Sequence, residues 1–205
     1  ANTLTISNNT TGANFTNSGT MALSSAHAVT FAGTATHTIS GTCAFNNINT
    51  TTGINFGTSS TINGNLTINA GGFVSTNPPT YGASSTLTYN TGAGYAASTE
   101  WTANALTGQG VPNNVTISTA ATSVNFGAST QYRRLRGNLT ISASTTLALS
   151  TAVGGDLRVG ANWTNSGTFT ANSRAVYFDG SAGQTINATA SFPYLFIANT
   201  SANVT

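Results

Sequence analysis

The chain has 205 residues, of which 39% are hydrophobic, so it is long enough to bury a core and too apolar for a disordered polymer. Thr (40), Asn (25), Ser (22) and Gly (22) fill more than half of it, whereas charged residues make up only 4%, against about 25% in ordinary soluble domains. The net charge of +2 comes without a basic stripe, which argues against a nucleic-acid-binding protein.

Eleven short triplets follow one another along the chain, each with two apolar residues around a central residue that is usually polar. They are Leu4–Ile6, Val29–Phe31, Ile54–Phe56, Leu66–Ile68, Leu87–Tyr89, Val115–Ile117, Val124–Phe126, Leu139–Ile141, Leu147–Leu149, Leu157–Val159 and Val176–Phe178. Alternation with period two, broken by Gly, Asn and Ser clusters, predicts short strands with one face inward.

No stretch has a sustained helical period, and the best candidate, Ala96–Leu106, is short and interrupted by Thr. Strands this short bury little alone, so we predict an all-β fold in which they stack as a right-handed parallel β-helix (β-solenoid) with almost no helix. Residues 1–205 then form a single elongated segment. The side chains predicted to point inward are Leu66, Ile68, Leu139, Ile141, Val176 and Phe178.

Two internal repeats support a stacked array. The segment Gly12–Thr20 recurs as Gly160–Thr168, with a single change of Phe to Trp. We expect these two segments to adopt the same conformation on the same side of the solenoid. A shorter repeat relates Gly64–Ile68 to Gly137–Ile141, with a three-residue insertion at Tyr132–Arg134 accounting for its changed offset.

The sequence also predicts how the segment continues. Val204 and Thr205 align with Val124 and Asn125, so the chain is expected to stop within a strand and to be a piece of a longer repetitive protein. Because the ends of a solenoid expose unpaired strand groups, we expect further repeats or subunits to stack on both ends.

Four motifs together resemble a known class of protein. They are Gly64–Ile68, Ser85–Asn90 with the later Glu100-Trp101, Pro112–Ile117 and Asn162–Thr168. Nearly the whole chain is similar to the β-helical repeat regions of very large cell-surface proteins of Bacteroidetes-type bacteria. The resemblance implies export by the type IX secretion machinery, an extracellular or cell-surface location, and a role as an adhesin or fibre. It supplies no catalytic residues.

Catalysis is the rival hypothesis, because some polysaccharide lyases and hydrolases are parallel β-helices. A glycosidase needs two carboxylates across the scissile bond, and the whole supply here is Glu100, Asp156 and Asp179. Asp156 and Asp179 lie beside glycines in predicted turns, where Asp suits the backbone. We expect the three acids to be scattered and the protein not to be an enzyme.

Other groups that could carry chemistry are few. His27 and His37 occupy alternating positions with no nearby acid or cysteine, which favours packed or solvated imidazoles over a metal site or a base. Cys43 is the single cysteine, which excludes an intrachain disulfide, and its alternating stretch predicts a small interior residue. We expect no metal, no cofactor and, since apolar runs are short, no membrane span and no attached signal peptide.

Three arginines form the one charge cluster, Arg133, Arg134 and Arg136, at the three-residue insertion. Through forked hydrogen bonds they could contact an anionic ligand such as an acidic glycan or a lipid headgroup. The simpler interpretation is a solvated loop that projects from the solenoid.

Thr-x-Thr pairs raise a third class of function, ice binding. That function needs threonines stacked in register on a flat face, about 4.8 Å apart. Pairs such as Thr36/Thr38, Thr86/Thr88 and Thr168/Thr170 recur at irregular intervals, which counts against it. The sequence therefore favours a non-catalytic structural or adhesive segment, whose partners could be glycans or other surface ligands. A polysaccharide-binding or polysaccharide-degrading protein is the first alternative and an ice-binding module the second.

Overall fold

The computed structural model describes residues 3–9, 14–19, 27–188 and 190–205, and it is a parallel β-solenoid of about eight turns. One nine-stranded parallel sheet runs the length of the molecule, in the order β1-β3-β6-β9-β12-β14-β17-β20-β23. Its strands are Thr3–Asn8, Ala28–Gly33, Asn47–Thr50, Asn65–Asn69, Thr86–Asn90, Asn114–Ile117, Leu139–Ile141, Trp163–Asn165 and Ile186–Ala188.

After most strands of the long sheet, the chain makes a second and a third strand before it returns. The second strands form the sheets β10-β7-β4-β2 and β13-β15-β18-β21, and the third strands form β11-β8-β5 and β16-β19-β22-β24. The second strands are Asn14–Thr16 (β2), His37–Ser40 (β4), Gly53–Asn55 (β7), Phe73–Val74 (β10), Gly94–Ala96 (β13), Ser123–Asn125 (β15), Thr146–Ala148 (β18) and Thr168–Thr170 (β21). The third strands are Cys43–Phe45 (β5), Ser60–Ile62 (β8), Thr80–Tyr81 (β11), Arg133–Leu135 (β16), Leu157–Val159 (β19), Ala175–Phe178 (β22) and Tyr194–Ile197 (β24).

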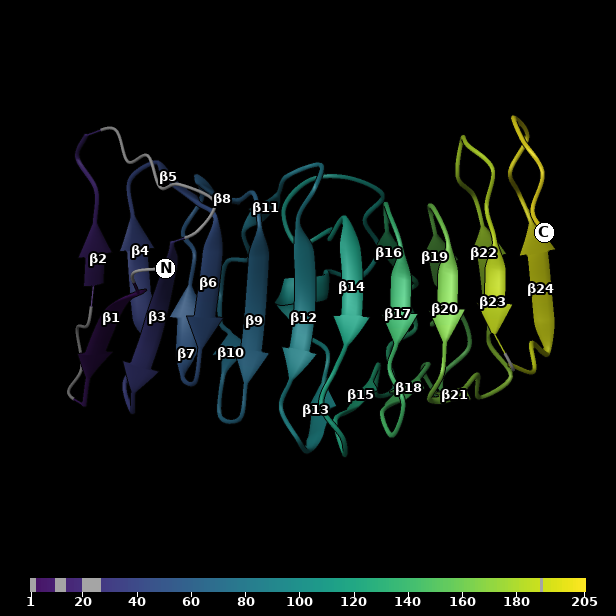
Figure 1. Ribbon diagram of the computed structural model, residues 1–205, viewed down its shortest axis with the longest axis horizontal. Coiled ribbons are helices and arrows are strands. Elements are labelled where there is room, and N and C mark those ends of the chain that lie inside the picture. Colours follow the sequence, from purple (N-terminus) through teal and green to yellow (C-terminus); the bar gives the residue numbers. More distant parts are fainter. Residues whose placement is uncertain (1–2, 10–13, 20–26, 189) are drawn as a thin grey trace.

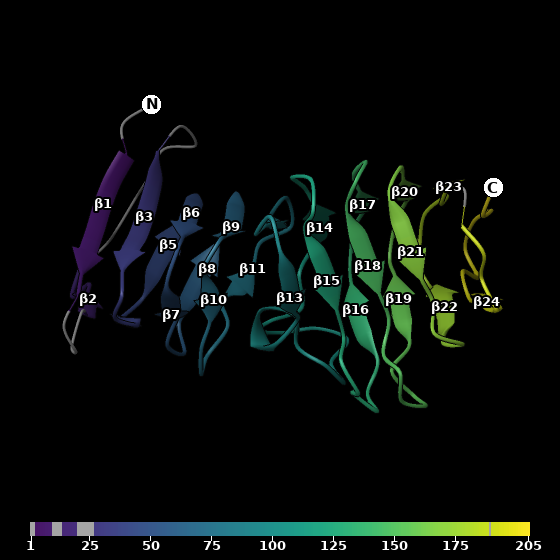
Figure 2. The same ribbon diagram turned by 90° about the horizontal axis from the view of Figure 1, so that it is seen from below.

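The two ribbon views establish the hand of the coil. In Figure 1 the long sheet lies on the near side, its strands run downward, and successive turns advance from left to right. In Figure 2, seen from below, the long sheet lies nearer the top of the picture than the second and third strands, so those strands lie behind it in the view of Figure 1. A chain that descends in front and returns behind while advancing to the right is right-handed, as predicted.

The core is a stack of inward side chains, because alternate residues of every strand face the axis. All six residues predicted to point inward are fully buried. Burying a Leu or Ile side chain of this kind stabilises the fold by about 1.5–3 kcal/mol. Helix in the described part of the chain is limited to one 3-10 turn, η1 (Thr99–Trp101), which lies inside the stretch that gave the best helical candidate.

The shorter repeat is confirmed, and the longer one is only partly right. Gly64–Ile68 and Gly137–Ile141 both contribute to the long sheet, through β9 and β17. In contrast, Phe15 lies in β2, a second strand, whereas Trp163 lies in β20 of the long sheet. The expectation that the longer repeat returns to the same side is therefore wrong, because the interval between its two copies is not a whole number of turns.

What the longer repeat does conserve is its local turn. The Asn17 side-chain oxygen accepts a hydrogen bond from the Gly19 N–H (3.1 Å), and the Asn165 oxygen accepts one from the Gly167 N–H (3.0 Å). Gly12, Ala13 and Thr20 of the first copy lie outside the described residues. The described part of the chain contains no helix with the length and apolar character needed to cross a membrane.

Candidate functional site

The regular coil is interrupted once within the continuously described stretch 27–188. Between β13 and β14, residues 97–112 take the place of a third strand and form a loop with η1 at its start. Trp101 and Val111 of this loop are fully buried, so it fills the side of the coil that a strand would otherwise cover. Ala103 pairs with Arg133 through an isolated antiparallel bridge, which joins the loop to β16.

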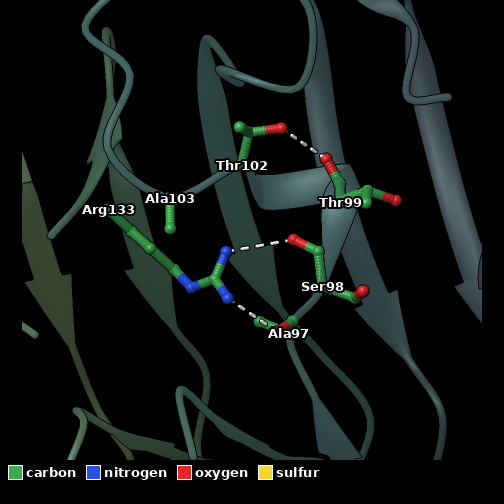
Figure 3. A pocket seen from close by; sticks show the side chains of 6 residues that line it. All are labelled: Ala97, Ser98, Thr99, Thr102, Ala103 and Arg133. Carbon is green, nitrogen blue, oxygen red and sulfur yellow. Dashed lines mark hydrogen bonds between the residues drawn. The ribbon is translucent and has the colours of Figure 1, made fainter. Parts of the chain in front are cut away.

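A pocket of about 290 Å³ opens where the loop meets β16. It is lined by Ala97, Ser98, Thr99, Thr102, Ala103 and Arg133 (Figure 3). The Arg133 guanidinium points between the two loop residues nearest to it, donating to the Ser98 carbonyl from Nη1 (3.0 Å) and to the Ala97 carbonyl from Nη2 (2.8 Å). Both terminal nitrogens are thereby used to hold the loop against the coil.

Arg133 is therefore a structural cation and not part of a projecting loop. Its strand β16 pairs with β19, the residue is 6% exposed, and its guanidinium lies 5.2 Å from the centre of the Phe126 ring. Burial lowers the pKa of Arg133, while the negative charge of Glu100 acts in the opposite direction. The interpretation of this segment as a solvated loop is wrong, since the alternating pattern of Arg133 and Leu135 continues the third-strand sheet.

Glu100 belongs to the loop, and its side chain points into the core. Its Oε1 accepts hydrogen bonds from the Tyr89 hydroxyl (3.0 Å) and from the Ser98 N–H (2.8 Å), and the residue is fully buried. Burial raises the pKa of Glu100, and the hydrogen bonds and the charge of Arg133 partly offset that rise. Its second carboxylate oxygen, Oε2, has no hydrogen-bond partner among the described residues. Glu100 does not line the pocket.

The other two arginines of the predicted cluster diverge. Arg136 donates from Nη2 to the Tyr81 carbonyl (2.5 Å), whereas Arg134 points outward and donates from Nη1 to the Leu106 carbonyl (3.1 Å) and from Nη2 to Asp179 (3.3 Å). Burial lowers the pKa of Arg136. The structure therefore does not bring the three guanidinium groups together at one point.

In their place, the third strands assemble an outward row that we call the arginine–aromatic strip: Arg134, Arg158, Tyr177 and Phe196. These four residues are in register across β16, β19, β22 and β24. The Tyr177 and Phe196 rings are stacked, with centroids 4.7 Å apart and planes 11° apart. The Arg158 guanidinium lies 4.8 Å from the centre of the Tyr177 ring.

A single carboxylate holds the two strip arginines. Asp179 accepts from Arg158 (2.9 Å) as well as from Arg134 (3.3 Å), and its side chain is 11% exposed against 30% for that of Arg158. Together, Arg134, Arg158 and Asp179 carry a net charge of one positive unit. Sequence reasoning missed Arg158, although it occupies the central, outward position of the triplet Leu157–Val159. Arg134 holds the same position between Arg133 and Leu135.

The remaining predicted groups are structural. The sequence predicts a local turn role for Asp156; instead, its Oδ1 accepts a hydrogen bond from the Ala175 N–H at the start of β22 (2.8 Å), which joins two successive turns of the coil. His37 is fully buried with Nε2 2.8 Å from the Ala32 carbonyl, and Cys43 is buried, which raises the pKa of its thiol. No group of three His, Cys, Asp or Glu side chains suited to a metal is found in the described ranges.

Comparison with known proteins gives no further guide to what these surfaces bind. No family model matches the chain, and neither a curated protein nor a solved structure matches it.

Proposed function

We propose that this chain is a non-catalytic structural and adhesive segment of a secreted bacterial surface protein or extracellular fibre, and that the arginine–aromatic strip contacts glycans. The observation that carries the proposal is the strip itself, four outward residues aligned along the coil axis on one side. The resemblance of the sequence motifs to large type IX secreted proteins supports the extracellular location and the secretion route.

The chemistry of the strip suits an acidic polysaccharide. Aromatic faces pack against the apolar faces of sugar rings, and the guanidinium fork forms paired hydrogen bonds with a carboxylate. Arg134 and Arg158 share one anion, Asp179, so a bound carboxylate or sulfate would complete the neutralisation of the pair. A linear polymer could lie along the row and contact several turns at once.

The positions of the acids support a role without catalysis. Glycoside hydrolysis needs two carboxylates about 5–10 Å apart on either side of the bond. Here Asp179 is paired with two arginines, Asp156 accepts a hydrogen bond from the Ala175 N–H of the next turn, and the Glu100 side chain is buried in the core. Each acid thus has a structural partner of its own.

The first prediction concerns binding to acidic glycans. On immobilised alginate or polygalacturonate, we expect Tyr177→Ala and Arg158→Ala to weaken retention about 5–30-fold, the loss of about 1–2 kcal/mol expected for an anchor residue. Phe73→Ala is the matched control, because Phe73 is also a strand aromatic, 44% exposed, but lies on β10 away from the strip. Retention is measured by affinity electrophoresis or biolayer interferometry.

Equal losses in all three variants, or no retention of the parent protein, would argue against the strip. The same samples are assayed for new reducing ends and for unsaturated products. We expect none; cleavage that Glu100→Gln abolishes would replace the adhesive proposal with an enzymatic one.

We also propose that further repeats or subunits stack on the ends. Leu195 and Ile197 of β24 are in register with the fully buried Val176 and Phe178, yet they are 43% and 54% exposed. At the other end, Leu4 of β1 is 55% exposed. Another coil in parallel register would bury these side chains and pair the open strand edges.

The second prediction is therefore concentration-dependent association of residues 1–205, measured by sedimentation velocity. Leu195→Asp with Ile197→Asp should shift the protein toward monomer, because the charges would be buried in the contact. Leu106→Asp, at a residue with 46% exposure on the loop, should leave association unchanged. A parent protein that stays monomeric at every concentration would contradict end-to-end stacking.

A further inference from the structure

The long sheet carries an outward row with one residue from each of its nine strands, which we call the threonine column. In register, its members are Thr5, Thr30, Asn49, Thr67, Thr88, Thr116, Thr140, Thr164 and Asn187. Seven of the nine are threonine. Figure 1 shows their strands side by side along the whole molecule. Neighbouring members are therefore about 4.8 Å apart, the spacing of paired strands.

This alignment could not be seen in the sequence. The stretch of chain between neighbouring members is much longer from Thr88 to Thr116 than from Asn49 to Thr67. The loops between strands absorb that difference, and the hydrogen-bonded register restores the alignment. Irregular intervals therefore do not count against an ordered face, and most of the stacked threonines are not members of the Thr-x-Thr pairs.

A ladder of asparagines beside the column fixes the register. In each step, a side-chain oxygen accepts a hydrogen bond from a backbone N–H of the next turn. The pairs are Asn47 with Asn65 N (3.0 Å), Asn114 with Asn138 N (2.9 Å), Asn138 with Asn162 N (3.0 Å) and Asn162 with Thr185 N (2.8 Å). Because these bonds repeat in the axial direction, they hold the strands of the face in a rigid, periodic arrangement.

The threonine hydroxyls themselves remain available. Within the described part of the chain, the structure gives no protein partner to the side chains of Thr67, Thr88, Thr116, Thr140 and Thr164. Each is half-buried by its neighbours and presents a hydroxyl and a methyl group to the outside. The column therefore offers a row of free hydrogen-bonding groups alternating with small apolar ones.

The face is also free of charge and of exposed aromatic rings. The nine strands contain no Asp, Glu, Lys or Arg, and the aromatic rings of Phe31, Tyr89 and Trp163 point into the core. A sugar lattice would be expected to need ring stacking, and the stacked aromatic rings of the strip lie on a different side of the coil. An uncharged periodic array of hydroxyls and methyls is instead suited to ordering water.

From these observations we infer that the threonine column binds the surface of ice. Water oxygens held by the hydroxyls would repeat at the strand spacing, and the methyl groups would restrict the water between them. Ice is the ligand in which water oxygens already occupy a periodic array, so a rigid face can join it through many weak contacts at once. This site is distinct from the glycan-binding strip and does not depend on it.

The test is partition into a slowly growing ice hemisphere, with an inert globular protein of similar mass as a reference. The parent protein should enter the ice and should also inhibit recrystallisation. Thr116→Lys combined with Thr140→Lys should lower its incorporation at least about tenfold, because two hydrated charges at the centre of the face prevent the fit. Thr61→Lys is the matched control, since Thr61 points outward from the middle strand of β11-β8-β5.

Circular dichroism and urea unfolding first establish that all variants are folded. A parent protein excluded from ice to the same degree as the reference overturns the inference. So does equal incorporation of the column variant, or equal loss in Thr61→Lys. The inference is also overturned if the parent protein stays out of ice but binds crystalline cellulose or chitin, and the column variant loses that binding. The face would then be assigned to a glycan lattice. Tyr177→Ala should keep full ice binding, which separates this inference from the glycan proposal.

Discussion

Replacing Trp101 by Ala is expected to lower the free energy of unfolding by about 3–5 kcal/mol, the range for removing a large aromatic from a core. The indole is fully buried, meets the Phe126 ring edge-on with centroids 5.1 Å apart, and donates from Nε1 to the Arg134 carbonyl (2.9 Å). Its loss would leave a cavity at the junction where the loop replaces a strand. Urea unfolding followed by fluorescence and circular dichroism measures the change.

Two further variants separate packing from hydrogen bonding. Trp101→Phe keeps most of the volume and loses the indole donor, so its cost should be intermediate. Leu106→Ala changes an exposed residue of the same loop and should alter the free energy of unfolding by less than about 0.5 kcal/mol. If Trp101→Ala unfolded at the same urea concentration as the parent protein, the loop would not be part of the cooperative core.

Arg133→Met is expected to cost about 3–5 kcal/mol, because it removes the cation that compensates buried Glu100 and leaves two loop carbonyls without their donor. Adding Glu100→Gln should recover part of that loss, since the uncompensated charge is then gone. A double-mutant cycle from urea unfolding of the four proteins gives the coupling. No recovery in the double variant would show that the two side chains are not coupled.

The same four proteins should differ in how the free energy of unfolding depends on pH. Burial raises the folded-state pKa of Glu100, so the folded protein holds that proton more tightly than the unfolded chain. This contribution favours folding below the ordinary Glu pKa of about 4.3, and it is lost as pH rises toward the folded-state pKa. Arg133→Met raises that pKa further and extends the decline to higher pH, whereas Glu100→Gln lacks this contribution altogether.

Much of the fold could be predicted because strand alternation is a local property. In triplets such as Leu66–Ile68 and Leu139–Ile141, the order of apolar and polar residues already indicates which side chains face the core. The structure confirms that the four apolar side chains are buried. The side of the coil on which a strand lies is not local, since it depends on the length of every preceding loop. The same repeated motif therefore placed Phe15 and Trp163 on different sides.

The candidate sites follow the same rule. Arg133, Arg134 and Arg136 are close together in sequence but serve three different parts of the fold, whereas Arg158 joins Arg134 only through strand register. The threonine column depends entirely on register, so no local pattern could reveal it. Glu100 was one of three acids considered for catalysis, but the burial of its side chain follows from the loop that replaces a third strand, which only the coil as a whole defines.

The parallel coil also fixes the length of solenoid that a given number of residues can build. Each turn uses roughly two dozen residues to advance the shaft by about 4.8 Å, so a projection of about 1,000 Å would take on the order of 5,000 residues. Under tension the length per residue increases greatly, because one unwound turn would release about 70–80 Å of extended chain in place of its rise of about 4.8 Å. A filament built from such turns would therefore be short for its mass but highly extensible under tension.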